Sequence, residues 1–284
     1  MNFKKIIISI ILSLSLSACM GVKFGYNNLD WFVPWYLDDY LDLNVDQKAA
    51  FDQHLEVIWN WHRLNELPQY SNLLREIITD LDKEQMTLEK LHYFSDQSKT
   101  LYLKVVNKAL EEGQPLIKSL NDEQLEELYE NIAETDEEYK EYVADNDLEK
   151  REQKQLKSIT KTFKKWIGKL SKKQKILLKT WTNDTMSTAE LRVQYVAKVR
   201  GSFKVAMAGR ENMAQTNKQL LILATQPELL QSKELNDRIE LNNQLFRQLL
   251  LDTIETLSPK QQRRLRKKIL SYAEDFSELS QQTD

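Results

Sequence analysis

The phrase Leu43-Asn44-Val45-Asp46-Gln47 returns in related form four more times along this chain. The later copies are Leu81-Asp82-Lys83-Glu84-Gln85, Leu120-Asn121-Asp122-Glu123-Gln124, Leu170-Ser171-Lys172-Lys173-Gln174 and Leu257-Ser258-Pro259-Lys260-Gln261. The second residue of each phrase is a favoured helix N-cap, and the glutamine three positions later can complete a capping box. The leucine before the N-cap can staple the entering chain. Five helix starts of one type predict an all-α protein.

The composition supports this fold class. Among 284 residues there are only 6 Gly and 5 Pro, about 4 % of the chain against a usual ~12 %. Hairpin turns in sheets and phosphate-binding loops both need glycine, and no G-x-G or G-x-x-x-x-G-K arrangement is present. The single cysteine excludes an intrachain disulfide and a cysteine-based zinc site. A content of 41 % hydrophobic residues is too high for a disordered chain.

The spacing of the phrases predicts an elongated bundle of long antiparallel helices over residues 44–284. Pro68 and Gly113-Gln114-Pro115 are expected to break or kink the first two segments. The region 121–169 has no Pro, and no Gly before Gly168, which fits one very long helix ending at that glycine. Two more helices and a late break are expected at 188–207, 233–256 and Pro227.

The N-terminus carries an export signal. Lys4 and Lys5 precede an apolar run over 6–16 that is too short for a stable membrane span. The run ends in Leu16-Ser17-Ala18-Cys19, which resembles the lipobox of bacterial lipoproteins. In that family the signal is removed before the cysteine, which then receives diacylglycerol and a further acyl chain such as palmitate. The resemblance implies a signal peptide over 1–18 and a membrane anchor on Cys19; the alternative is an ordinary signal peptide with an incidental cysteine.

The residue after the cysteine bears on the membrane. In lipoproteins of this kind, Asp at this position favours retention in the inner membrane, and here it is Met20. The resemblance therefore implies attachment to the outer membrane on its periplasmic side. Segment 19–43 then follows as a lipidated, aromatic-rich stretch. Its rings either lie at the membrane interface or strap this end onto the helical body, and the nearby aspartates favour docking on protein.

Two segments resemble a family of uncharacterised Gram-negative lipoproteins of about this length. They are Tyr26-Asn27-Asn28-Leu29-Asp30-Trp31 and the stretch 61–70, which reads Trp-His-Arg-x-x-Glu-Leu-Pro-x-Tyr. The resemblance extends along most of the chain, including Trp166-Ile167-Gly168. It implies an anchored helical protein and adds no mechanism, because the family has no established activity. The five phrases also resemble the L-T-x-x-Q signature of small periplasmic stress chaperones, which bind unfolded clients on a concave face.

The stretch 61–70 holds the densest chemistry. Its candidate residues, for either an interaction site or a structural clasp, are Trp61, His62, Arg63, Glu66 and Tyr70. His62 and Glu66 lie one helical turn apart, but His54 is ~12 Å from His62 by helical rise, so no metal site is predicted. A hydrogen-bond network of His62 with Glu66 or Arg63, fixing the helix before Pro68, is the favoured interpretation.

Charge is segregated along the middle of the chain. Residues 121–149 contain 13 acidic side chains and one Lys, whereas 150–179 contain 12 basic side chains and one Glu. A helical stripe is formed by Lys150, Lys154, Lys157, Lys161 and Lys164. Such stripes are usually solvated faces, and the acidic block offers neutralisation; otherwise the stripe would meet an anionic partner.

No motif for catalysis, a cofactor or a metal stands out. The sequence therefore favours a non-enzymatic lipoprotein that binds an envelope protein as scaffold, adaptor or chaperone-like factor. Nucleic acid is not an expected partner of an exported chain. Two alternatives stay open, an envelope hydrolase that uses paired carboxylates on peptidoglycan or glycan, and a binder of an amphiphile between helices.

The lipobox yields a direct prediction. Cys19→Ala should leave an unprocessed precursor or a mislocalised protein, because the acyl chains on Cys19 are the expected anchor. Membrane fractionation and the mass of the N-terminal peptide measure both effects. Normal outer-membrane fractionation of the Cys19→Ala protein would contradict the lipoprotein assignment.

Overall fold

The computed structural model describes residues 21–282, so the predicted signal peptide and Cys19 lie outside the described residues. Every regular element in this range is a helix, which confirms the all-α fold. The elements are α2 (Gly21–Tyr26), α3 (Leu29–Asp38), α4 (Val45–Trp61), η1 (His62–Glu66), α5 (Leu67–Asp82), α6 (Leu88–Ser119), α7 (Asp122–Asp145), α8 (Leu148–Ile167), α9 (Lys172–Asp184), α10 (Ala189–Ala208), α11 (Met213–Thr225), η2 (Pro227–Leu229), α12 (Lys233–Glu255) and α13 (Pro259–Ser280). Among residues 21–282 no helix is long and apolar enough to cross a membrane.

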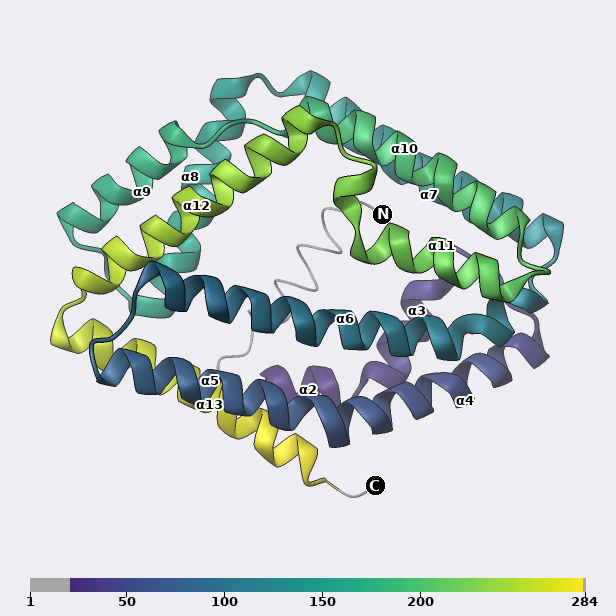
Figure 1. Ribbon diagram of the computed structural model, residues 1–284, viewed down its shortest axis with the longest axis horizontal. Helices are drawn as coiled ribbons and strands as arrows, with labels where there is room; N and C mark the ends of the chain where they lie inside the picture. Colours follow the sequence, from purple (N-terminus) through teal and green to yellow (C-terminus); the bar gives the residue numbers. More distant parts are fainter. Residues whose placement is uncertain (1–20, 283–284) are drawn as a thin grey trace.

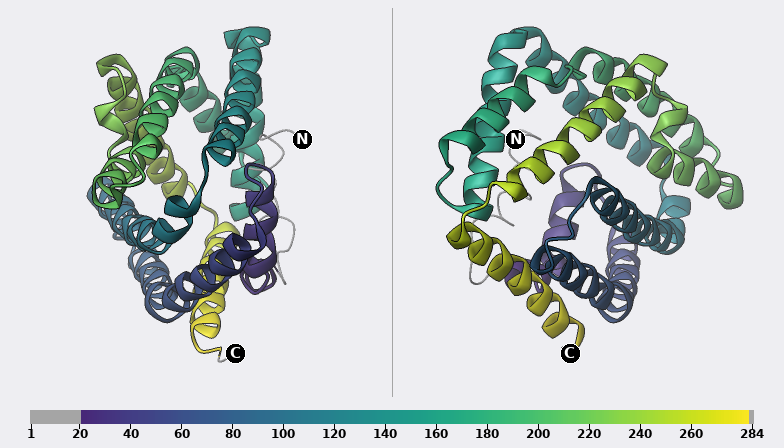
Figure 2. Two further views of the ribbon diagram at one scale, coloured as in Figure 1. Left: turned by 90° about the vertical axis from the view of Figure 1, so that its right-hand side faces the viewer. Right: turned by 60° about the vertical axis from the view of Figure 1, so that its left-hand side comes forward.

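The helices form a three-sided frame (Figure 1). The base is the rod α4–η1–α5, with α6 returning antiparallel above it and α13 lying along α5. One upper side consists of α7, α10 and α11, and the other consists of α8, α9 and α12. Neighbouring helices in each group run antiparallel, and the two turned views show the groups meeting at the corners of the frame (Figure 2).

One corner is built on a reciprocal pair of glutamine amides. The Nε2 of Gln47 donates to Oε1 of Gln124 at 3.1 Å, and the Nε2 of Gln124 donates to Oε1 of Gln47 at 2.7 Å. Each Nε2 also donates to a carbonyl two residues before the other glutamine's N-cap, those of Ser119 and Asp42. Each Oε1 accepts from the N–H of its own N-cap, which completes the predicted capping boxes. The pair therefore joins the starts of α4 and α7 to the end of α6.

The same arrangement recurs at a second corner. Gln174 and Gln261 exchange amide hydrogen bonds of 3.1 and 2.9 Å and donate to the carbonyls of Thr256 and Lys169. Both capping boxes are complete, and Pro259 occupies the first turn of α13 as expected. Gln174 is 1 % exposed, so its amide is fully satisfied by protein groups in a dry site. This pair joins the starts of α9 and α13 to the ends of α8 and α12.

The second phrase does not start a helix, and this part of the prediction is wrong. It ends α5: the N–H of Glu84 bonds the carbonyl of Leu81, the N–H of Gln85 bonds that of Asp80, and Glu84 has a φ of 55°. These bonds make a Schellman motif with a left-handed residue after the helix. The next helix, α6, starts instead at Leu88, where the Thr87 side chain is the N-cap.

Three further expectations have definite outcomes. Pro115 does not break the chain, because α6 runs through it from Leu88 to Ser119. The region 121–169 is two helices, α7 and α8, because Asp147 caps the backbone of Lys150 and starts a new helix. Gly168 does follow the end of α8, with a φ of 83°, as expected. The expected later helices are α10 and α12, and Pro227 does stand in the break between α11 and α12.

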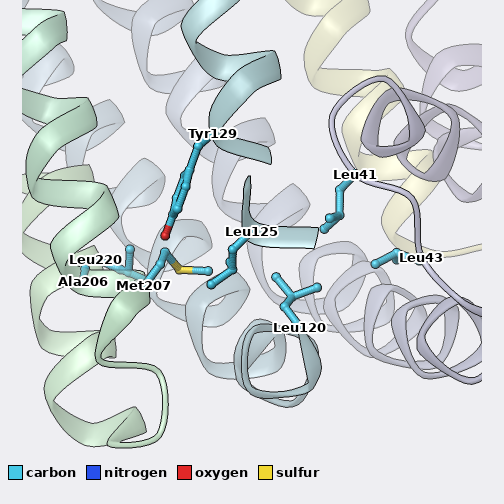
Figure 3. Packing of buried hydrophobic residues seen from close by; sticks show 8 residues of the cluster. All are labelled: Leu41, Leu43, Leu120, Leu125, Tyr129, Ala206, Met207 and Leu220. Carbon is cyan, nitrogen blue, oxygen red and sulfur yellow. The ribbon is translucent and has the colours of Figure 1, made fainter. Parts of the chain in front are cut away.

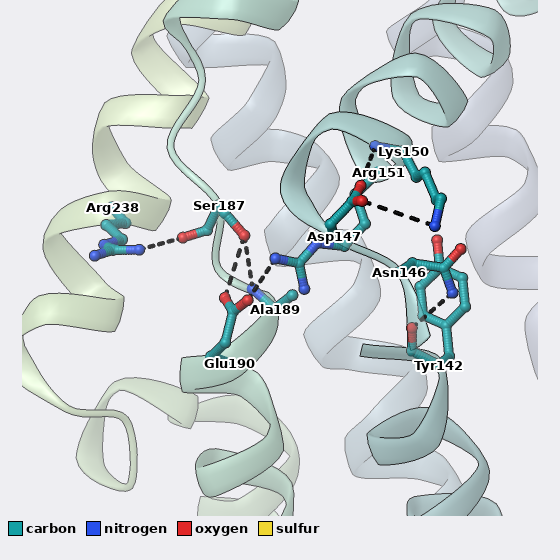
Figure 4. Close-up of polar contacts among 9 residues, drawn as sticks. All are labelled: Tyr142, Asn146, Asp147, Lys150, Arg151, Ser187, Ala189, Glu190 and Arg238. Atoms are coloured by element: carbon teal, nitrogen blue, oxygen red, sulfur yellow. Dashed lines mark hydrogen bonds and ion pairs between the residues drawn. The ribbon is translucent and has the colours of Figure 1, made fainter. Parts of the chain in front are cut away.

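The cores lie at the corners and at the base. The largest cluster fills the corner of the first glutamine pair, with side chains from the chain before α4 and from α6, α7, α10 and α11 (Figure 3). A second cluster, around Phe163, Leu178 and Leu249, fills the corner of the second pair. A third is formed by Tyr26, Leu67 and Leu279 and joins α2 to the base. The α7–α8 turn is tied to α10 by an Arg151–Glu190 ion pair (Figure 4).

The glutamine pairs predict an uneven cost of substitution. Gln174→Leu should lower the free energy of unfolding by ~2–4 kcal/mol, because it leaves buried backbone groups and the Gln261 amide without partners. Urea unfolding followed by circular dichroism measures this change. Gln85→Leu is the matched control, since Gln85 is exposed and its phrase completes no capping box. Equal losses in the two variants would contradict the role given to the pair.

Candidate functional site

A cleft of about 960 Å³ lies between α3 and α4. Its lining comes from one face of each helix, at positions that recur every three or four residues, and from Gln282 near the C-terminus. The lining residues on α3 include Asp30, Trp31, Trp35 and Asp38, and those on α4 include Asp52, Glu56 and Trp59. We call this cleft the α3–α4 groove.

The walls of the groove combine acids with exposed indole rings. Trp31 and Trp35 lie nearly parallel, with ring centroids 6.1 Å apart and an interplanar angle of 10°. They are 60 % and 42 % exposed, although large aromatic side chains usually bury most of their surface. Asp38 is paired with Lys48 at 3.4 Å, whereas Asp52 and Glu56 form no ion pair among the described residues. The groove therefore presents negative charge beside two aromatic faces.

The floor of the groove is built by a turn of π-helix. Residues 62–66 form η1 inside the otherwise continuous rod, and such turns interrupt α-helices often at functional sites. Arg63, 7 % exposed, lies over the Trp59 ring at 5.4 Å and donates to the Gln282 carbonyl. Glu66, 2 % exposed, accepts from Gln69. The expected kink near Pro68 thus takes the form of this π turn just before it.

His62 connects two segments of the chain. Its Nδ1 is 3.0 Å from the Tyr26 hydroxyl on α2, and its Nε2 is 3.1 Å from the Tyr70 hydroxyl on α5. Burial lowers the pKa of His62 to about 4, and burial raises the pKa of Tyr70 to about 12, with a further contribution from the charge of Glu66. The imidazole is therefore neutral at pH 7 and pairs one hydroxyl donor with one hydroxyl acceptor. The geometry is that of a clasp.

The predicted cluster is brought together, with different partners. The structure pairs His62 with two tyrosines rather than with Glu66 or Arg63. The half-buried Trp61 ring lies 6.4 Å from the His62 ring and completes the group. His54 points elsewhere and bonds Glu112 of α6 at 2.7 Å. Within residues 21–282 no group of three or more metal-ligating side chains occurs.

The basic stripe lies on the exposed face of α8. Lys150 pairs with Asp147 at 3.7 Å (Figure 4), and Lys154 lies 4.8 Å from the centroid of the Tyr142 ring. The remaining three lysines are exposed and form no ion pair in the described part of the chain: Lys157, Lys161 and Lys164.

The acidic block is directed to another helix. On α7, Asp136 pairs with Arg200 at 2.8 Å and Asp122 pairs with Arg210 at 2.6 Å, both on α10. The two oppositely charged blocks are consecutive in sequence, yet these ion pairs join α7 to a helix about 60 residues further on. The lysine stripe is left as a solvated face.

Sequence reasoning missed the α4 wall of the groove. Asp52, Glu56 and Trp59 share one helix face with Arg63, at the spacing i, i+4, i+7 and i+11. That stripe was visible in the sequence. Its pairing with α3 was not, because the short segment between the two helices leaves the orientation of α3 open.

Fold and site together define an all-α protein with an acidic, tryptophan-lined groove beside its N-terminal helices. The chain belongs to a family of unknown function, DUF6279, whose sequence model matches residues 39–236. No curated protein and no solved structure matches the chain. The matched range includes the α4 wall and the π turn, whereas α3 precedes it. The expected membership of an uncharacterised family is thus confirmed.

The clasp predicts a loss of stability in acid. His62 has a pKa of 6.5 when unfolded and about 4 when folded, so between these values the unfolded chain binds more protons. The contribution of His62 to stability is therefore present above pH 6.5 and falls by ~2–3 kcal/mol as the pH drops to 4. Urea unfolding at pH 7, 5.5 and 4 measures the slope.

The comparison variant for this prediction is His62→Gln. Its amide can hydrogen-bond both tyrosines but does not titrate, so its stability should fall less steeply in acid. An identical acid slope in the wild type and in His62→Gln would show that other groups cause the loss.

Proposed function

We propose that this protein is a non-enzymatic lipoprotein, held by acyl chains on Cys19 at the periplasmic side of the outer membrane, that binds a basic segment of another envelope protein. The observation that carries this proposal is the α3–α4 groove, with its carboxylates and two exposed parallel tryptophans. Carboxylates attract lysine and arginine, and indole faces bind their cationic groups. A basic segment would therefore meet both charge and ring contacts in this groove.

The position of the groove supports an anchored binding role. From Cys19 to Asp30 the chain spans at most ~40 Å, even if fully extended. A partner bound between α3 and α4 would therefore lie close to the membrane surface. This placement suits a scaffold or adaptor that holds an envelope protein near the lipid.

The alternatives receive less support from the site. A carboxylate-pair hydrolase needs an acid whose pKa is raised for proton donation. Burial raises the pKa of Asp136, but this residue pairs with Arg200 on the α7–α10 side and does not line the groove. A chaperone for unfolded clients would expose a wide apolar concavity, whereas the walls of this groove are charged. A binder of one basic partner fits the lining best.

The groove can be tested in living cells by site-specific photocrosslinking from position 60. A photoreactive phenylalanine in place of Asn60, which lines the groove, should capture a partner peptide with net positive charge. Asp52→Asn with Glu56→Gln should reduce this capture at least tenfold, because both substitutions remove groove carboxylates. Mass spectrometry identifies the captured peptide and its quantity.

The matched control removes the same charge elsewhere. Glu126→Gln with Glu130→Gln changes two exposed carboxylates at the same i, i+4 spacing on α7 and should leave the capture unchanged. Capture of an acidic or apolar peptide would contradict the proposal. Equal loss in both double variants would also contradict it, because net charge rather than the groove would then be responsible.

A further inference from the structure

A second cleft, of about 530 Å³, lies between α5, α6, α8, α12 and α13. It is separate from the α3–α4 groove and shares no lining residue with it. Its walls are mostly apolar and include Phe94, Phe163, Trp166, Leu250, Ile254 and Ile269. Both its volume and its apolar lining fall within the range of small-molecule sites.

The cleft is long and narrow. On α12 its lining residues recur at helical spacing from Asn243 to Leu257, which corresponds to ~21 Å of helix. Polar groups gather towards the first of these residues, where Arg247 also lines the cleft and pairs with Glu240 at 3.2 Å. The other end is closed by Leu265 and apolar neighbours. The lining is thus polar and cationic at one end and apolar at the other.

One polar atom inside the cleft has no partner. Thr253 is 5 % exposed, and its hydroxyl forms no hydrogen bond among the described residues. Thr182, on α9, shows the usual solution for a buried helical threonine, because its hydroxyl donates to the carbonyl of Leu178. An orphaned buried hydroxyl costs free energy unless a ligand supplies an oxygen for it. Thr253 therefore marks a place for an oxygen atom within the apolar part of the cleft.

From this arrangement we infer that the cleft binds a phospholipid with a single acyl chain. The chain lies among the apolar side chains near Ile269, its ester oxygen accepts from Thr253, and its phosphate meets Arg247. Six residues of helix separate Arg247 from Thr253, or ~9 Å, which suits the glycerol that joins phosphate to ester. The site and this ligand are thus matched in order: cation, hydroxyl donor, apolar end.

Other occupants fit the lining less well. A peptide would bring backbone amides into a cleft that offers one inner hydroxyl, and each unpaired group would be costly. A fatty acid has no ester oxygen to place at Thr253 while its carboxylate meets Arg247. A lipid with two chains needs a wider cleft. The inference does not depend on the α3–α4 groove or on its proposed partner.

The test uses the mature lipidated protein in lipid nanodiscs and a lysophosphatidylglycerol that carries a diazirine near the end of its acyl chain. After irradiation, labelled peptides are identified by mass spectrometry. Label should appear in the lining segments of α5, α8 or α13, and unlabelled lysophosphatidylglycerol should compete at least tenfold better than palmitate. Label confined to α2 and α3, or equal competition by palmitate, would overturn the inference.

The orphaned hydroxyl supplies the decisive variant. Thr253→Val should reduce cleft labelling about 5- to 10-fold, because the ester loses its donor, while thermal stability stays equal or rises. Thr182→Val is the matched control and should leave the labelling unchanged. Unchanged labelling in Thr253→Val would overturn the inference.

A steric pair of variants tests the cleft itself. Leu250→Trp should fill it and abolish labelling, whereas Leu241→Trp, at an exposed position on the same helix that does not line the cleft, should not. Undiminished labelling in a folded Leu250→Trp protein would overturn the inference. If Leu250→Trp does not fold, Thr253→Val and its control decide the outcome.

Discussion

Two reciprocal amide pairs, Gln47 with Gln124 and Gln174 with Gln261, hold the corners of the frame. A capping box ordinarily serves one helix end. Here each glutamine serves its own helix, its partner glutamine and the carbonyl at the end of a preceding segment. Because these bonds lie in nearly dry sites, the free energy lost with one member is larger than that of an ordinary cap. The directions in which helices leave each corner follow from this shared network.

The frame also decides what the N-terminal segment presents. Tyr26 is buried against the base and bonded to His62, so the end of α2 is fixed. A few residues later, Trp31 and Trp35 are left exposed over a groove instead of filling a core. The two expected roles of the aromatic stretch are therefore divided along its length. One end docks on the helical body, and the other forms a wall that faces solvent.

The rod α4–η1–α5 concentrates several features in one helical turn. The π turn adds one residue to the helix, which shifts the register of everything after it. As a result His62 reaches two tyrosines while Arg63, the next residue, lies over Trp59 at the groove. The clasp and the groove floor are thus adjacent residues with different tasks. This proximity links the stability of the α2 contact to the shape of the groove.

The sequence alone determined the helical fold class, four of the helix starts and the glycine stop at Gly168. Capping is local: an N-cap and its glutamine are three residues apart, so their bonds form whatever lies around them. The sequence also showed that His62, Arg63 and Glu66 belong together, since they share one turn. Export and the anchor at Cys19 are predictions from the sequence that stand outside the described residues.

Only the tertiary structure decided which glutamines pair, because residues 77 and 87 positions apart meet through the path of whole helices. It decided that the phrase at Leu81 ends a helix, since a Schellman turn and an N-cap use similar polar residues. It decided too that acidic α7 pairs with α10 and that α3 faces α4 across a groove. These are contacts between distant segments, and their free energy depends on burial and register that no local pattern contains.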